Sequence, residues 1–224
     1  MPSEVLELLA DPAGIELRAS DVFGNLYRMR LTDPAANAHV HRAGSAAVTI
    51  QVSGVLEPVF VPDPKTPPLA HFFGVHAFLT TEAGSPVLVL DLRLFNAHAD
   101  LEPGPLDDNV NDLVFRRLEL AVPGGYSVVQ AYGAAGVGEP QLSSTENVLP
   151  LVVPEPDGAA HVFPQGFQTN RRLAIAPFSG FDAALERVAR AGRGFAVGGA
   201  SATTGEALWH WSNPETARYF PQRF

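Results

Sequence analysis

Alternation of apolar and polar residues with a period of two recurs along this chain, and that period is typical of β-strands with one buried face. In residues 87–97, leucines fill every second position on one side, whereas the other side is mixed. We therefore expect 87–97 to be the central strand of a sheet. On its mixed side, we expect Asp91 and Arg93 to pair across strands with Arg117 and Glu119.

Shorter segments of the same kind predict the remaining strands. They cover 15–19, 26–31, 37–42, 46–52, 55–61, 71–81, 113–122, 126–132, 147–153, 160–163, 171–176, 194–198 and 206–211. Turn residues at Gly24-Asn25, Ala43-Gly44 and Pro123-Gly124-Gly125 predict hairpins between the strands that flank them. In 62–68, four prolines predict a stiff loop, because proline cannot donate to a strand ladder.

One segment has the pattern of a helix instead. Residues 182–191 begin with an N-cap candidate, Asp182, carry basic residues in the last turn and precede Gly192. We therefore expect an all-β fold, a large antiparallel β-sandwich of the super-sandwich kind, with one short C-terminal helix. The 224 residues fit a single domain over 1–224, and the stretch near 133–146 is the candidate for a weak internal boundary.

The amino-acid composition excludes several classes of protein. Hydrophobic residues make up 46% of the chain and charged residues 17%, which excludes a disordered protein. A formal net charge of −9 opposes nucleic-acid binding, and the lack of cysteine excludes disulfides and thiolate metal sites. The N-terminus has no signal-peptide pattern, and no apolar run is long enough for a membrane span. We expect a soluble protein that is cytoplasmic or is released within an assembly.

Two histidines with the spacing of strand neighbours form the first candidate site. His39 and His41 would project from one face of a strand, and two imidazoles placed in this way can share a metal ion. His71, His76 or His98 could supply a third ligand. The alternative is a pair of exposed strand histidines without a ligand.

A run of acidic and amide residues in the loop after the central strand forms the second candidate. Asp107, Asn109 and Asn111 have the alternate spacing of oxygen ligands that opens a calcium loop, so Ca2+ is the cofactor to consider. Asp112 stands where the turn glycine belongs, and Leu118 stands where a bidentate glutamate belongs. Asx-rich turn chemistry is the alternative interpretation.

The exit of the central strand and a tryptophan pair supply the remaining candidates. Asn96, His98 and Asp100 form a polar strand exit in which His98 and Asp100 could act as a base and its orienting carboxylate, although no nucleophile accompanies them. Trp209 and Trp211 would lie on one face of a strand, where indoles can stack against sugar rings. Core burial or a subunit interface would explain the tryptophans equally well.

The run from 71 to 125 also carries a family pattern. A long strand is followed by Gly84-Ser85-Pro86, a second strand that ends at Asn96, and a third strand before Pro123-Gly124-Gly125. This pattern resembles the β-sandwich domain of bacterial proteins similar to exo-acting rhamnogalacturonan lyases. The resemblance implies a fold and a carbohydrate context, and no catalytic motif of that family falls on named residues here.

Two functions follow as hypotheses. The first is a non-catalytic, carbohydrate-associated β-sandwich protein that binds a glycan through aromatic and loop residues. The second is a structural subunit of a virion, an appendage or a filament, which self-assembles with copies of itself or another partner through aromatic and proline-rich contacts. A catalytic role as a relative of polysaccharide lyases or glycoside hydrolases has the least support, because no acid, base and substrate clamp can be assembled from the spacing.

Overall fold

The structure is a computed structural model, and it describes residues 3–33, 37–96, 112–130, 141–153 and 157–180. Among the described residues, one short helical element precedes all the strands in the sequence and another follows them, with thirteen strands between the two. The elements are α1 (Ser3–Ala10), β1 (Glu16–Asp21), β2 (Leu26–Arg30), β3 (Asn37–Ala43), β4 (Ala47–Val55), β5 (Glu57–Phe60), β6 (Phe73–Glu82), β7 (Leu88–Asn96), β8 (Leu113–Pro123), β9 (Tyr126–Gln130), β10 (Gln141–Leu142), β11 (Glu146–Pro150), β12 (His161–Phe163), β13 (Gln168–Pro177) and the 3-10 turn η2 (Phe178–Gly180).

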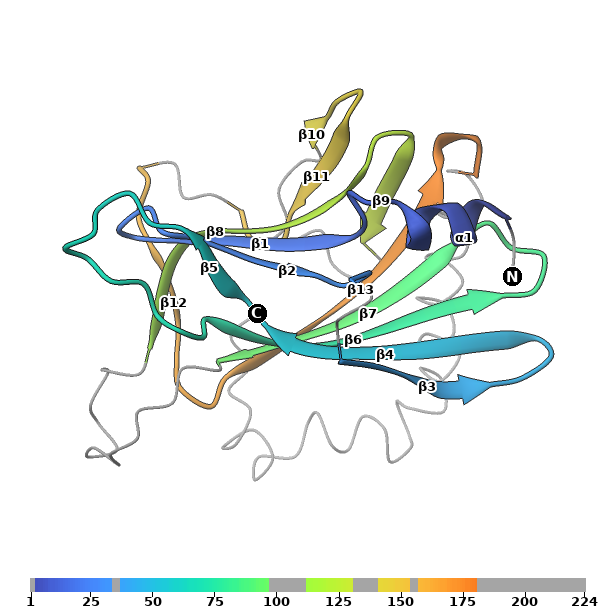
Figure 1. Cartoon of the computed structure of the whole chain (residues 1–224), viewed down its shortest axis with the longest axis horizontal. Helices are drawn as coiled ribbons and strands as arrows, with labels where there is room; N and C mark the ends of the chain where they lie inside the picture. Colours follow the sequence, from blue (N-terminus) through green and yellow to red (C-terminus); the bar gives the residue numbers. More distant parts are fainter. Residues whose placement is uncertain (1–2, 34–36, 97–111, 131–140, 154–156, 181–224) are drawn as a thin grey trace, which may run out of the picture.

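The strands form two antiparallel sheets, as the alternation of residues predicted. The seven-stranded sheet has the order β10-β11-β8-β1-β2-β5, with β12 also paired to β8. The six-stranded sheet has the order β3-β4-β6-β7-β13-β9. In Figure 1, strands β8, β1 and β2 lie above β7, β6 and β4. The expected all-β, sandwich-like fold is therefore confirmed.

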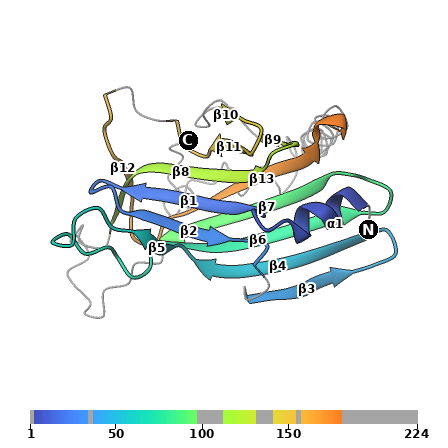
Figure 2. The same cartoon turned by 45° about the horizontal axis from the view of Figure 1, so that its top comes forward.

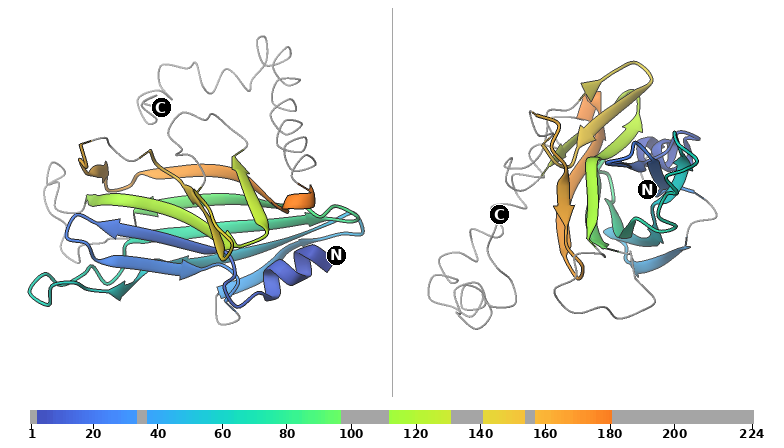
Figure 3. Two further views of the ribbon diagram at one scale, coloured as in Figure 1. Left: turned by 90° about the horizontal axis from the view of Figure 1, so that it is seen from above. Right: turned by 90° about the vertical axis from the view of Figure 1, so that its left-hand side faces the viewer.

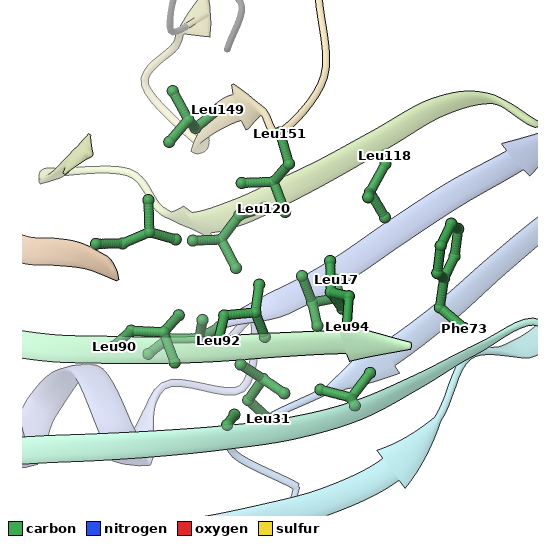
Figure 4. Packing of buried hydrophobic residues seen from close by; sticks show 14 of the residues in the cluster. Leu17, Leu31, Phe73, Leu90, Leu92, Leu94, Leu118, Leu120, Leu149 and Leu151 are labelled. Carbon is green, nitrogen blue, oxygen red and sulfur yellow. The ribbon is translucent and has the colours of Figure 1, made fainter. Parts of the chain in front are cut away.

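A single hydrophobic core joins the two sheets. The alternate leucines of β7 and those of β1 and β8 are nearly inaccessible to solvent and belong to one cluster of buried residues. Figure 4 shows Leu90, Leu92 and Leu94 of β7 facing Leu118 and Leu120 of β8. Strands with a period of two bury one face each, so this packing leaves the outward faces of both sheets for polar side chains.

The neighbours of several strands agree with the prediction from the sequence. Strand β7 lies between β6 and β13, so its position inside a sheet is confirmed. The hairpins β1/β2 and β3/β4 are formed as expected around Gly24-Asn25 and Ala43-Gly44.

The hairpin predicted between 113–122 and 126–132 is wrong. Strand β8 pairs with β1, β11 and β12, whereas β9 pairs with β13 in the other sheet, so the chain crosses between sheets at Gly124-Gly125. A Cβ on Gly124 would lie 2.3 Å from the carbonyl oxygen of Ser144, and Gly125 has a φ of 89°. The glycines allow a tight turn both in a hairpin within one sheet and in a crossing between two sheets. The turn residues alone therefore do not determine which sheet contains the next strand.

The helices differ from the prediction at the N-terminus. Helix α1 was not predicted, because its eight residues are too few to establish a helical period and it depends on tertiary packing. Its Val5 and Leu8 are buried in the main core, and Figure 2 shows α1 at the end of the sheet where β1 begins. The predicted helix 182–191 and the predicted strands 194–198 and 206–211 lie outside the described residues.

The candidate domain boundary is only partly described. Residues 141–146 comprise β10, the turn that follows it and the first residue of β11, within the seven-stranded sheet. The rest of the 133–146 stretch lies outside the described residues, so the single-domain assignment over 1–224 stays a prediction.

Candidate functional site

The outward face of the six-stranded sheet carries two adjacent rows of polar and aromatic side chains that run across the strands. Each row consists of residues that are direct cross-strand neighbours, so their side chains lie on the same side of the sheet. The first row is Ser53, His76, Arg93 and Asn170, and the second is His39, Gln51, Phe78, Asp91 and Arg172. Together with Phe95 and His41, these residues are called the polar face below.

A stacked ring pair occupies the first row. The rings of His76 and Phe95 have centroids 5.2 Å apart and an interplanar angle of 27°. The Nδ1 atom of His76 lies 2.9 Å from the hydroxyl oxygen of Ser53, which holds the imidazole in place. Phe95 lies over Gly74, where a Cβ would come within 2.2 Å of the ring. Glycine at position 74 therefore allows this ring to lie flat against the sheet.

A second ring pair lies beside the first. His41 meets Phe78 edge-on, with centroids 5.2 Å apart and an interplanar angle of 73°. The register of β3 against β4 shifts between Val40 and Arg42, so His41 is the extra residue of a β-bulge. This bulge interrupts simple alternation in β3 and places both His39 and His41 near the second row.

Charged and amide groups continue both rows onto β7 and β13. Arg172 donates to both carboxylate oxygens of Asp91, with distances of 2.5 and 2.9 Å. Two residues along from this pair on each strand, the Nε atom of Arg93 donates to Oδ1 of Asn170 at 3.4 Å. The Arg93 side chain is exposed, and Phe78 and Phe95 are half-buried. The polar face thus presents fixed hydrogen-bonding groups beside accessible ring surface.

The outward face of the other sheet has a different character. Arg18 donates to both carboxylate oxygens of Glu146, at 3.1 and 2.7 Å, and also to Glu16, which pairs with Arg28. These contacts raise the pKa of Arg18, and the hydrogen bond from Arg18 lowers the pKa of Glu146. This face therefore carries a charge network centred on Arg18, and no ring pair of the kind seen on the polar face is found among its described residues.

The structure places five of the residues predicted from the sequence, namely His39, His41, His71, His76 and Asn96. His39 and His41 lie on the exposed strand β3, and among the described residues no group of three or more His, Cys, Asp or Glu side chains could hold a metal ion. Asn96 ends β7 with its Nδ2 donating to the carbonyl oxygen of Phe163 at 3.3 Å, and it pairs opposite the buried Phe73. Asn96 is therefore not part of the polar face.

The other predicted site residues lie outside the described part of the chain. These are His98, Asp100, Asp107, Asn109, Asn111, Trp209 and Trp211. The calcium loop, the His98/Asp100 pair and the tryptophan platform accordingly stay predictions.

Several residues of the polar face were not recognised as site candidates from the sequence. The mixed side of 87–97 contained Asp91, Arg93 and Phe95, and alternation in β6 placed Phe78 on the same side as His76, which was considered only as a third metal ligand. Their pairing partners were predicted wrongly, since Asp91 and Arg93 contact β13 and not Arg117 and Glu119, which lie in the other sheet. Alternation identifies a face, but it does not identify the strand that lies beside it.

Comparison with family models, with curated proteins and with solved structures found no match to this chain. The resemblance of residues 71–125 to the lyase-like β-sandwich domain therefore stays a prediction. Within the described residues, no helix combines the length and the apolar character needed to cross a membrane.

Proposed function

We propose that the protein binds a glycan on the polar face of its six-stranded sheet, without a catalytic step. The observation that carries the proposal is the juxtaposition of two ring pairs, His76/Phe95 and His41/Phe78, with the Asp91–Arg172 pair in adjacent rows. The apolar face of a pyranose packs on aromatic rings, while its hydroxyls accept and donate hydrogen bonds at the edges.

The groups that surround the rings fit this chemistry. Asp91 is an acceptor and Arg93 a donor, and Gln51 and Asn170 can each do both. The Asp91 carboxylate and the Arg172 guanidinium are held together by two hydrogen bonds, so they are oriented before a ligand arrives. Orientation in advance reduces the entropy that a flexible polar side chain loses on binding.

The contacts that His76 and Asp91 already make within the protein favour binding over catalysis. The His76 ring is engaged by Ser53 on one side and stacked on Phe95, and the Asp91 carboxylate is paired with a guanidinium. A general acid or base has to exchange a proton with the substrate, whereas the Asp91 carboxylate already binds the Arg172 guanidinium through both of its oxygens.

Retention on immobilised acidic and neutral polysaccharides, followed by a glycan array, tests the proposal on the full chain. We expect Phe78→Ala and Phe95→Ala to weaken retention by about tenfold or more, because aromatic contacts of this kind contribute on the order of 1 kcal/mol each beyond the area they bury. Leu142→Ala is the matched control, since Leu142 lies on β10 of the other sheet and is 64% exposed.

Two outcomes would contradict the glycan proposal. If the unmodified chain is retained on no polysaccharide, the function itself is wrong. If retention survives both phenylalanine variants but is lost in Trp209→Ala or Trp211→Ala, a glycan is bound at the tryptophan pair and not on the polar face.

A separate observation favours assembly as a second candidate function. Four large apolar side chains at or near the open edge of the seven-stranded sheet are exposed: Phe23 in the turn between β1 and β2, Leu26 on β2, and Val59 and Phe60 on the edge strand β5, with exposed fractions of 63%, 44%, 51% and 54%. Leu26 and Phe60 are cross-strand neighbours. This edge patch adjoins the proline-rich loop, because Pro62 lies 3.5 Å from the position a Cβ would take on Gly24.

We infer from the edge patch that a second copy of the chain docks there, since an exposed apolar edge strand favours association. Sedimentation velocity over a wide concentration range tests this inference. Oligomers should form in the unmodified chain and decrease in Phe23→Ser and Phe60→Ser, whereas Val162→Ser, at a 56% exposed position of β12, should change nothing. A monomer at all concentrations would remove this second function.

A further inference from the structure

One row of the polar face carries hydrogen-bond donors and no carboxylate. The row of Ser53, His76, Arg93 and Asn170 crosses β4, β6, β7 and β13. Its side chains are a hydroxyl, an imidazole, a guanidinium and a carboxamide, and each of these groups can donate a hydrogen bond. The row also adjoins an aromatic surface, because the Phe95 ring stacks on His76. In Figure 3, β4, β6, β7 and β13 lie side by side in the left view, so the row lies within one continuous sheet.

Arg93 is the charged member of this row, and it has no ion-pair partner among the described residues. Its side chain is exposed, and Nε donates to Oδ1 of Asn170 at 3.4 Å. The carboxylate on the same side of β7, that of Asp91, already accepts two hydrogen bonds from Arg172. The terminal nitrogens of Arg93 therefore remain available to a ligand.

His76 places a second donor beside the same guanidinium. It is the direct cross-strand neighbour of Arg93, and such neighbours have Cβ atoms about 5 Å apart. The Nδ1 atom lies 2.9 Å from the hydroxyl oxygen of Ser53, whereas Nε2 makes no hydrogen bond with another described residue. An oxyanion between the two side chains could accept hydrogen bonds from both.

The charge of the whole outward face favours the same kind of ligand. The chain has a formal net charge of −9. Among the described residues, however, the outward side of the six-stranded sheet carries three arginines, at positions 42, 93 and 172, and two carboxylates, at positions 82 and 91. The three histidines of the polar face add positive charge when they are protonated. A face of this kind attracts anions locally, although the net charge of the chain repels them.

We infer that the ligand of the polar face carries an anionic oxygen group, a carboxylate or a sulfate ester, which binds between Arg93 and His76 while the adjoining sugar ring lies on Phe95. This inference rests on the proposed glycan function and specifies its substrate class. A neutral sugar would use the rings but would leave the guanidinium without a charged acceptor. Because hydrogen bonds between ionised groups are roughly twice as strong as those between neutral groups, the anionic group should determine which glycans bind most tightly.

A glycan array with neutral, carboxylated and sulfated members, probed with the full chain, tests the inference. We expect the most tightly bound glycans to carry a carboxylate or a sulfate. Neutralising the best of them, by carboxyl reduction or by desulfation, should weaken binding by about tenfold or more, because a hydrogen bond to a charged group is lost. The treatment that has this effect identifies which anionic group is bound.

Variants of Arg93 assign the effect to this residue. Arg93→Gln keeps a donor but removes the charge, so binding of anionic glycans should fall by about tenfold or more and their advantage over neutral glycans should disappear. Arg93→Lys keeps the charge and should preserve the advantage, although it loses the planar fork of donors. The control is Arg117→Gln, which removes the same charge at an exposed position of β8 in the other sheet and should leave binding unchanged.

Two results would overturn the inference. The first is tightest binding to neutral glycans, with loss in Phe95→Ala and no effect of Arg93→Gln, and this result would leave the proposed glycan function standing. The second is binding of anionic glycans that Arg117→Gln weakens as much as Arg93→Gln does, because general attraction between charges would then explain it. Both differ from binding to no glycan at all, which would remove the proposed function and the inference with it.

Discussion

The Tyr27 hydroxyl of β2 and the Asp21 carboxylate at the end of β1 lie 3.0 Å apart, and both residues are buried. The same carboxylate accepts hydrogen bonds from the backbone N–H groups of Phe23 and Asn25 and from the Asn25 side chain. The tyrosine oxygen also accepts the backbone N–H of Leu69 at 3.1 Å. One phenol therefore connects the first hairpin to the segment that precedes β6.

Replacing Tyr27 by phenylalanine should destabilise the fold. The ring of Tyr27 is 1% exposed and stacks on Phe72, so Phe preserves the packing and removes only the hydroxyl. Because the variant leaves the Leu69 N–H and one Asp21 oxygen with one partner fewer, we expect a loss of about 1–3 kcal/mol in the free energy of unfolding. Urea denaturation measures it, and an unchanged midpoint would contradict the structural role assigned to the hydroxyl.

The same tyrosine should make stability sensitive to alkaline pH. Burial raises the pKa of Tyr27 from 10.0 to about 12, so the folded state favours the neutral phenol. This contribution is complete below pH 10.0 and is lost as the pH rises toward about 12. Tyr27→Phe should therefore lose less stability between neutral and alkaline pH than the unmodified chain does. Burial also raises the pKa of Tyr126, but Tyr126 is present in both proteins and does not contribute to the difference between them.

Glu146 should contribute to stability with the opposite dependence on pH. The hydrogen bond from Arg18 lowers its pKa from 4.5, so its contribution is present above that value and is lost as the pH falls through the lower pKa of the folded state. The Glu146 side chain is 40% exposed, and we expect Glu146→Gln to cost only about 1 kcal/mol or less at neutral pH. Denaturation midpoints at successive acidic pH values, with Glu57→Gln as control, would show whether the acid dependence decreases.

Gly74→Ala should disturb both stability and the polar face. Its methyl group would lie 2.2 Å from Cε2 of Phe95, so the ring has to leave its place beside His76. Overpacking of this kind costs about 1–3 kcal/mol, and polysaccharide retention should fall together with the melting temperature. Gly44→Ala, whose Cβ would lie 3.6 Å from the carbonyl oxygen of Ala47, should be neutral in both measurements.

Leu92→Ala should be among the most destabilising single changes in the core. The leucine is 1% exposed at the middle of the buried face of β7. Truncation leaves a cavity between the sheets, and we expect a loss of about 2–5 kcal/mol in the free energy of unfolding. The control is Leu142→Ala, at a 64% exposed position of β10, which should change the urea midpoint little.

Particular elements show how far the sequence could predict this fold. The leucines at 88, 90, 92 and 94 predicted both a strand and its buried side, and all four are buried. For 113–130 the strands were predicted but their pairing was wrong, because Gly124 and Gly125 permit a turn within a sheet or between sheets. Helix α1 lacked the length for a clear period, and its packing against the core could not be inferred locally.

For the candidate site too, the sequence determined some features and only the tertiary structure determined the others. Alternation alone determined that Asp91, Arg93 and Phe95 share one side of a strand, because successive side chains of an extended backbone point to opposite sides. Tertiary structure decided that Arg172, Asn170 and His76 lie beside them, since pairing brings together strands that are far apart in the chain. It also decided which outward alanines and valines are covered, because burial of a sheet face depends on what packs against it. Local covalent geometry thus determined the faces of the strands, and long-range register determined which faces became a site.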